Sequence, residues 1–149
     1  MGIFNKLKKA ANFLTGGGAE VELNIADGNI TDPINAQINI KVGEGELNVQ
    51  NIYMLLKCTE ITKTVVESED GEEIEENENF IYDEKIEIAG NQVLESEKEY
   101  LFTKEINLPE DAEGSLVEDN REVSWEFQAG IDIKGNDPDS GWIKVNLIK

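Results

Sequence analysis

Apolar and polar residues alternate with a period of two over most of this chain. The alternation is strictest in residues 34–42 and is also clear in residues 19–27 and 121–133. A period of two places the apolar side chains on one face of a β-strand, so each segment is predicted to be a strand with one buried face. The side chains predicted to face inward are Val21, Leu23, Ile25, Ile34, Ala36, Ile38, Ile40, Val42, Val123, Trp125, Phe127, Ala129, Ile131 and Ile133.

A longer strand is predicted over residues 49–66. Its first half is apolar on both faces, which is typical of a strand in the middle of a sheet, and its Thr- and Val-rich second half predicts an extension beyond the core. Strand character returns in residues 79–90, 92–109 and 141–148. Seven or eight strands joined by short turns predict an all-β fold, an immunoglobulin-like β-sandwich of antiparallel strands.

The first 15 residues follow a different period. At 100° per residue six of their apolar side chains fall within an arc of about 120°, with Phe13 as an exception on the polar side. Residues 1–15 are therefore predicted to form a short amphipathic helix, followed by a glycine joint at residues 16–18 and the sandwich at residues 19–149. The apolar stripe of this predicted helix consists of Ile3, Phe4, Leu7, Ala10, Ala11 and Leu14.

Such a short helix is marginal in water, so its apolar stripe is expected to dock. Three docking surfaces are open: its own sandwich, a partner protein or second copy, and a membrane surface with the neighbouring lysines at the headgroups. The candidate docking residues are Ile3, Phe4, Leu7, Lys8 and Leu14.

Residues 67–79, ESEDGEEIEENEN, contain eight acidic side chains and no basic one. Both flanks have strand character, so the run is predicted to be the tip of a hairpin that projects from the sheet. Three interpretations remain open: a solvated tip that blocks pairing between sheet edges, a docking surface for a basic partner, and a cation site. The acidic residues are Glu67, Glu69, Asp70, Glu72, Glu73, Glu75, Glu76 and Glu78.

The charge and the composition of the chain exclude several classes of function. The chain of 149 residues carries a formal net charge of −19, and a body this acidic repels nucleic-acid phosphates. It has no histidine, so catalytic sites built on histidine and metal sites with histidine ligands are excluded. No enzyme activity, cofactor or metal site is predicted. One cysteine and no recognisable secretory signal favour a reducing, cytoplasmic setting.

Several residues that could take part in catalysis or ligand binding have simpler structural explanations. Cys58 falls on the apolar face of a predicted central strand, so a buried, inert thiol is expected. Trp125 is predicted to lie in the core and Trp142 at its edge. The stretch GNDPDSG, residues 135–141, is predicted to be a turn rather than a calcium loop, and NIT, residues 29–31, is predicted to use its polar side chains in a turn.

Three stretches, in this order, resemble the amino-terminal domain of the arrestin-like superfamily. They read IFNKLKKAANFLTGGGAEVELNI, then ITDPINAQINIKVGEGELNVQNIYMLLKCTEI, then YLFTKEINLPEDAEGS with REVSWEFQAGIDIKGNDPDSGWIKVNLI. Within the superfamily they are similar to the SpoOM group of bacterial sporulation-control proteins. Ile34 and Asn35 depart from the glycine and glutamate that are common after the turn proline. Arrestin-like proteins usually have a second sandwich, whereas one is predicted here. The resemblance implies a role in regulation through protein interaction, without catalysis.

Two main functional hypotheses follow from the sequence. The first is a non-enzymatic, cytoplasmic regulatory or scaffold protein that binds other proteins. The alternative is a peripheral membrane adaptor anchored through residues 3–14. The sequence does not determine the oligomeric state.

Overall fold

The computed structural model describes residues 7–14, 18–134 and 137–149. The described residues form twelve strands and no helix. Five of these strands have only two or three residues, and two of the short ones, β11 and β12, together occupy the last predicted strand. The strands are β1 (Leu7–Leu14), β2 (Ala19–Ala26), β3 (Gly28–Asn29), β4 (Ile34–Val42), β5 (Leu47–Ser68), β6 (Gly71–Ala89), β7 (Gln92–Leu94), β8 (Glu99–Ile106), β9 (Leu116–Val117), β10 (Arg121–Ile133), β11 (Ile143–Val145) and β12 (Leu147–Ile148).

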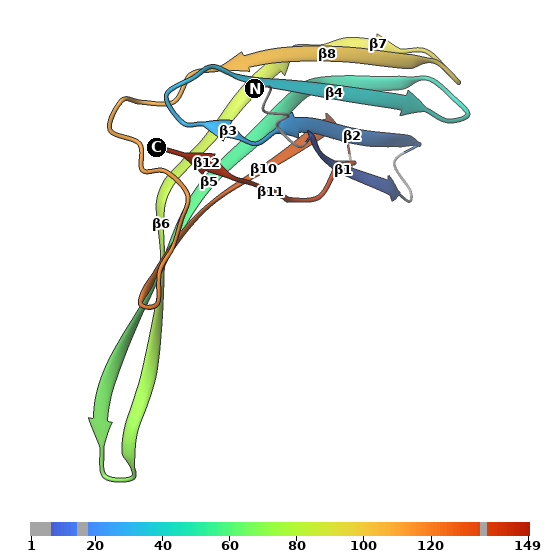
Figure 1. Cartoon of the computed structure of the whole chain (residues 1–149). Helices are drawn as coiled ribbons and strands as arrows, with labels where there is room; N and C mark the ends of the chain where they lie inside the picture. Colours follow the sequence, from blue (N-terminus) through green and yellow to red (C-terminus); the bar gives the residue numbers. More distant parts are fainter. Residues whose placement is uncertain (1–6, 15–17, 135–136) are drawn as a thin grey trace.

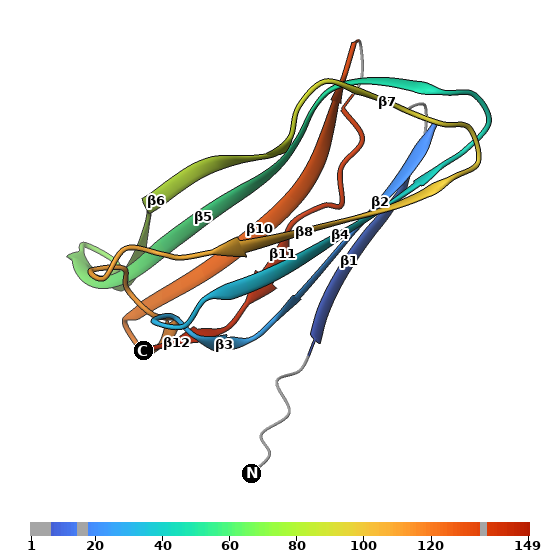
Figure 2. The ribbon, with the colours of Figure 1, turned by 90° about the horizontal axis from the view of Figure 1, so that it is seen from above.

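The strands build a two-layered sandwich, as the alternation predicted (Figures 1 and 2). One sheet has the order β1-β2-β4-β8, and the other has the order β11-β10-β5-β6. Pairing within both sheets is antiparallel. The short β7 and β9 pair with β5 and β10, and β12 pairs with β3 in parallel. The predicted antiparallel β-sandwich is therefore confirmed.

The core lies between the inner faces of β2 and β4 on one side and β5 and β10 on the other. Strand β4 shows the period of two in its burial, because its apolar residues are buried while its polar residues are exposed or partly exposed. In β10, Trp125 and Phe127 are almost fully buried, and in β5 the same holds for Leu56 and Cys58. All the side chains predicted to face inward are buried except Ile133, which is partly buried.

The amphipathic helix predicted over residues 1–15 is wrong for residues 7–14. These residues form strand β1, whose backbone pairs with β2 from Leu7 opposite Ala26 to Leu14 opposite Ala19. A short isolated helix is marginal, whereas the edge of β2 offers a row of backbone hydrogen-bonding groups along its whole length. Residues 1–6 and 15–17 lie outside the described residues, and with them Ile3, Phe4 and most of the predicted glycine joint.

This correction bears on the membrane hypothesis, which depended on that helix. Of the candidate docking residues, Leu7, Lys8 and Leu14 belong to β1. The described part of the chain has no helix with the length and apolar character needed to cross a membrane.

Replacement of a core side chain should cost far more than replacement of an exposed one. Leu56 is 0% exposed and Ile74 is 71% exposed. We expect Leu56→Ala to lower the free energy of unfolding by about 2–5 kcal/mol, because it leaves a cavity in the core. We expect Ile74→Ala to change it by no more than about 0.5 kcal/mol. Urea titration of both variants tests this difference, and equal losses would show that Ile74 is packed rather than exposed.

Candidate interaction surfaces

Strands β5 and β6 form a hairpin that extends well beyond the sandwich (Figure 1). Their pairing continues to Ser68 opposite Gly71, whereas β10, the other neighbour of β5, begins at Arg121 opposite Thr62. The last backbone contact on that side is the 2.8 Å hydrogen bond from Lys63 N to Asn120 O. Residues 63–76, here called the hairpin arm, are therefore a two-stranded ribbon about 20 Å long.

The tip of the arm confirms the predicted hairpin. Glu69 and Asp70 form the turn between β5 and β6, and the Ser68 hydroxyl donates a hydrogen bond to the Gly71 carbonyl oxygen at 3.0 Å. Gly71 has a φ of 119°, a conformation that residues with a Cβ rarely adopt, so glycine suits this position. The sequence therefore predicted the hairpin from its strand-like flanks, but residues 71–79, which were assigned to the tip, belong to strand β6.

All eight predicted acidic residues lie on or next to the arm and are exposed. Glu67 is on β5, Glu69 and Asp70 are in the turn, and the other five are on β6. Lys63 balances one of these charges through a 3.6 Å ion pair with Glu76. Within the described residues, no group of three or more carboxylate or cysteine side chains is arranged so that it could hold a metal ion.

The arm also exposes apolar side chains, which the sequence reasoning missed. Val65 and Ile74 lie directly opposite each other and are 66% and 71% exposed. Both lie on the face of the hairpin that points away from the core. Side chains alternate between the two faces of β5, and Leu56 and Cys58 are buried, so Val65, an odd number of positions further along, lies on the opposite face. Phe80, opposite Thr59 and 63% exposed, belongs to the same face.

A cation–π contact links this face to the end of the chain. The Lys57 ammonium lies 4.1 Å from the centroid of the Trp142 ring and 5.8 Å from that of the Phe80 ring. Trp142, predicted at the edge of the core, is 40% exposed. Val65, Ile74, Phe80 and Trp142 are here called the outer apolar line. Pairing the residues on either side of the turn at residues 69–70 would have revealed the Val65–Ile74 pair from the sequence.

A cavity of about 270 Å³ lies at the base of the hairpin, between β6 and the loop that follows β8. Its walls include Cys58, the Trp125 ring and the Tyr82 ring, and the two rings have their centroids 5.4 Å apart. Trp125 Nε1 donates a 2.8 Å hydrogen bond to the Glu113 carbonyl oxygen, so the loop is tied to the core. Trp125 therefore lies in the core, as predicted, with its one polar group satisfied.

Arg121 links the same loop to the hairpin. Its guanidinium donates to the Glu60 carboxylate at 2.6–2.7 Å and also to the Glu113 carboxylate. Two carboxylates from segments far apart in the sequence thus share one cation. This bridge holds the loop against the base of the hairpin arm.

Cys58 is buried, as the sequence predicted. Burial raises the pKa of its thiol to about 12, and the negative charge of Glu113 acts in the same direction. Burial and a hydrogen bond to Glu84 likewise raise the pKa of Tyr82 to about 12. Both groups therefore stay protonated near neutral pH, and Cys58 lacks the thiolate that nucleophilic chemistry requires.

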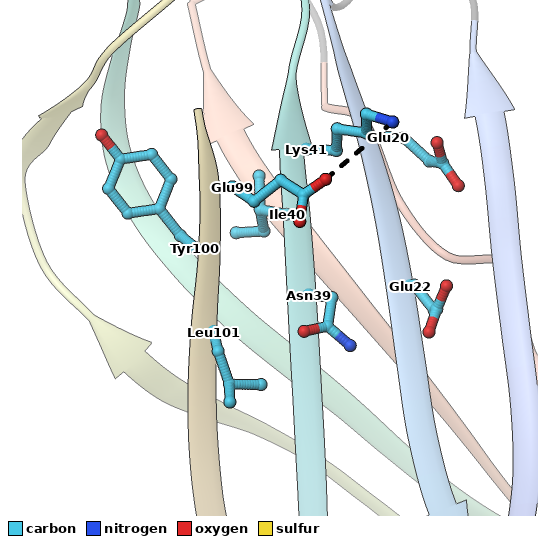
Figure 3. Close-up of a pocket in the computed structure, with 8 residues that line it drawn as sticks. All are labelled: Glu20, Glu22, Asn39, Ile40, Lys41, Glu99, Tyr100 and Leu101. Carbon is cyan, nitrogen blue, oxygen red and sulfur yellow. Dashed lines mark ion pairs between the residues drawn. The ribbon is translucent and has the colours of Figure 1, made fainter. Parts of the chain in front are cut away.

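A second hollow, of about 600 Å³, lies on the outer face of β2, β4 and β8 (Figure 3). Glu20 and Glu22 project into it from β2, and Lys41 of β4 forms a 3.9 Å ion pair with Glu99 of β8. Both partners of this pair are mostly exposed, so it adds about 0–1 kcal/mol to stability. The hollow is an open, mainly polar surface.

The NIT motif is a turn, as predicted. The Asn29 side-chain oxygen accepts hydrogen bonds from the Thr31 amide at 2.9 Å and the Thr31 hydroxyl at 2.6 Å. In GNDPDSG, residues 135 and 136 lie outside the described residues, and the part that follows runs beside β10. Ile131 N donates to Pro138 O at 2.9 Å, Ser140 N donates to Ala129 O at 2.8 Å, and the Asp139 side chain accepts from the Gly141 amide at 2.8 Å.

Comparison with known proteins supports the fold. No family model matches the chain, and no curated protein matches it in sequence. The crystal structure of Spo0M, the sporulation control protein from Bacillus subtilis, is similar over 89% of this chain, with a TM-score of 0.63 and 17% sequence identity. This chain spans about half of that protein, 50% of its length. At this identity the similarity shows the arrestin-like fold that the resemblance implied, and the fold alone.

The raised thiol pKa predicts slow chemical labelling of Cys58. With a pKa of about 12 instead of 9.0, the thiolate fraction at pH 8 should be about a thousandfold lower in the folded protein than in the unfolded chain. We expect Ellman's reagent to react at least that much more slowly with the native protein than with protein in denaturing urea. Rates within tenfold of each other would show that the thiol is accessible and ionised.

Proposed function

We propose that this chain is a non-enzymatic regulatory or scaffold protein that acts by binding other proteins, in a role similar to that of sporulation control proteins. The observation that carries this proposal is the hairpin arm with its outer apolar line. A cytoplasmic setting is part of the proposal and is supported by the single cysteine, which stays reduced and buried. The shared fold with Spo0M supports the regulatory role.

The arm has the composition of a binding surface rather than of a structural element. A two-stranded ribbon outside a core is marginally stable in water, and Val65, Ile74 and Phe80 gain little from their own fold there. Aromatic and branched apolar side chains ringed by charged ones match the core and rim of a protein interface. Contact with a partner would bury this apolar surface and order the arm.

The Lys57 contact favours the same face. The Lys57 ammonium lies over the Trp142 ring and also over the Phe80 ring, so the outer apolar line includes residues of the sandwich beyond the base of the arm. A flat partner could cover the arm and this part of the sheet together. Trp and Phe are large, rigid groups that dominate the energetics of such contacts.

Removal of the arm tests the proposal without disturbing the core. In the variant, residues 64–75 are replaced by Asn-Gly, which joins Lys63 to Glu76 through a two-residue turn. The deleted side chains are exposed, so we expect the free energy of unfolding to change by no more than about 1 kcal/mol. Proteins from the source cells that bind the full chain but not this variant would be identified by mass spectrometry, purified, and titrated against both proteins.

A matched pair of double variants separates the apolar line from general surface effects. Val65→Thr with Ile74→Thr keeps two β-branched residues on the arm but removes its apolar character. Val93→Thr with Val117→Thr makes the same kind of change at exposed positions elsewhere, which are 51% and 84% exposed. Of the two double variants, we expect only the one on the arm to bind the purified partner with lower affinity, by at least about tenfold. If the purified partner binds both double variants with equal affinity, the outer apolar line is not part of the binding surface.

A further inference from the structure

Strand β6 leaves a long free edge. It is the last strand of its sheet, and no described strand pairs with it on the side away from β5. From Gly71 to Phe80 its register with β5 is unbroken, and the irregularity comes only where Ile81 is inserted between Phe80 and Tyr82. All residues of this segment are exposed. The free edge of β6, Gly71–Phe80, is therefore a regular ten-residue stretch in which every second residue directs its backbone N–H and C=O groups away from β5, toward another strand.

The charge on this edge determines which strand it suits. Gly71–Phe80 carries five carboxylates and no basic residue. Antiparallel pairing with the same edge of a second copy would place carboxylates opposite carboxylates, which is unfavourable. A strand rich in lysine or arginine would instead meet opposite charges along its whole length.

The two faces of the edge differ. Glu73 and Glu75 share one face with two asparagines, while Ile74 and Phe80 lie on the other face together with three glutamates, Glu72, Glu76 and Glu78. An added strand with alternating basic and apolar residues would place its basic residues beside Glu73 and Glu75 and its apolar residues beside Ile74 and Phe80. It would also convert the two-stranded arm into a three-stranded sheet, which is the smallest sheet with independent stability.

We propose that the free edge of β6 binds an extended segment of a partner protein in which basic and apolar residues alternate, by addition of that segment as a strand. This deepens the proposed function, on which it rests, because it names the partner's chemistry and the way it binds. Main-chain hydrogen bonds would supply affinity, and the alternating side chains would supply specificity.

The test uses a defined probe and the whole protein. The probe is a labelled ten-residue peptide that alternates lysine and valine. We expect saturable binding that weakens with added salt. We also expect the amides of Gly71–Phe80 to become protected from hydrogen exchange when the peptide is bound. A peptide with N-methylated backbone at alternate residues, which lacks donors on one edge, should bind at least tenfold more weakly.

Charge-reversal variants provide the matched control. Glu73→Lys with Glu75→Lys changes the free edge of β6, and Glu99→Lys with Glu105→Lys makes the same change of net charge on β8, at the edge of the other sheet. We expect the first pair of substitutions to lower the affinity for the peptide about tenfold. We expect the second pair to change this affinity by less than about twofold.

Three outcomes would overturn strand addition: equal binding of the N-methylated peptide, equal losses in the two charge-reversal variants, or binding without protection of Gly71–Phe80. Sedimentation that shows a dimer held through this edge would replace the basic segment with a second copy. If removal of residues 64–75 abolishes binding of a purified partner while the peptide protects nothing, the proposed function stands and strand addition falls. If the peptide behaves as expected but no partner requires the arm, strand addition stands and the proposed function falls.

Discussion

The packing of two apolar sheet faces against each other is the interaction on which the rest of this structure depends. Leu23 and Ile38 come from one sheet, Leu56 and Phe127 from the other, and none of them is exposed. This contact holds β5 in register with β10 from Asn51 to Thr62. Because β5 continues without a break to Ser68, the core also determines where the hairpin arm begins and in which direction it leaves the sandwich.

The arm combines two properties that oppose each other. Val65 and Ile74 expose apolar surface, which favours association, while the carboxylates beside them keep the arm hydrated and repel an identical edge. The core carries the fold, and the arm contributes little to it. Under the proposed function, stability and binding would therefore be separated in space, and the arm could present a partner surface without any cost to core packing.

Much of this arrangement could be predicted from local pattern. The period of two identified the inward faces of β2, β4 and β10, and the strand-like flanks of residues 67–79 identified the hairpin. The prediction failed at residues 7–14, where a helical stripe was the stronger local signal but the edge of β2 offers a partner strand. The outer apolar line was missed because its members are 6 to 77 residues apart in the sequence, from Ile74 and Phe80 to Val65 and Trp142.

The sequence by itself therefore determined most strands of the sandwich, the hairpin that carries the acidic run, and the burial of Cys58 and Trp125, because each depends on residues that are close along the chain. Tertiary structure alone decided that residues 7–14 join a sheet, that Arg121 bridges Glu60 and Glu113, and that β6 ends its sheet with a free edge. These features depend on which distant segments compete for the same backbone edge or the same charge. Local periodicity carries no information about that competition.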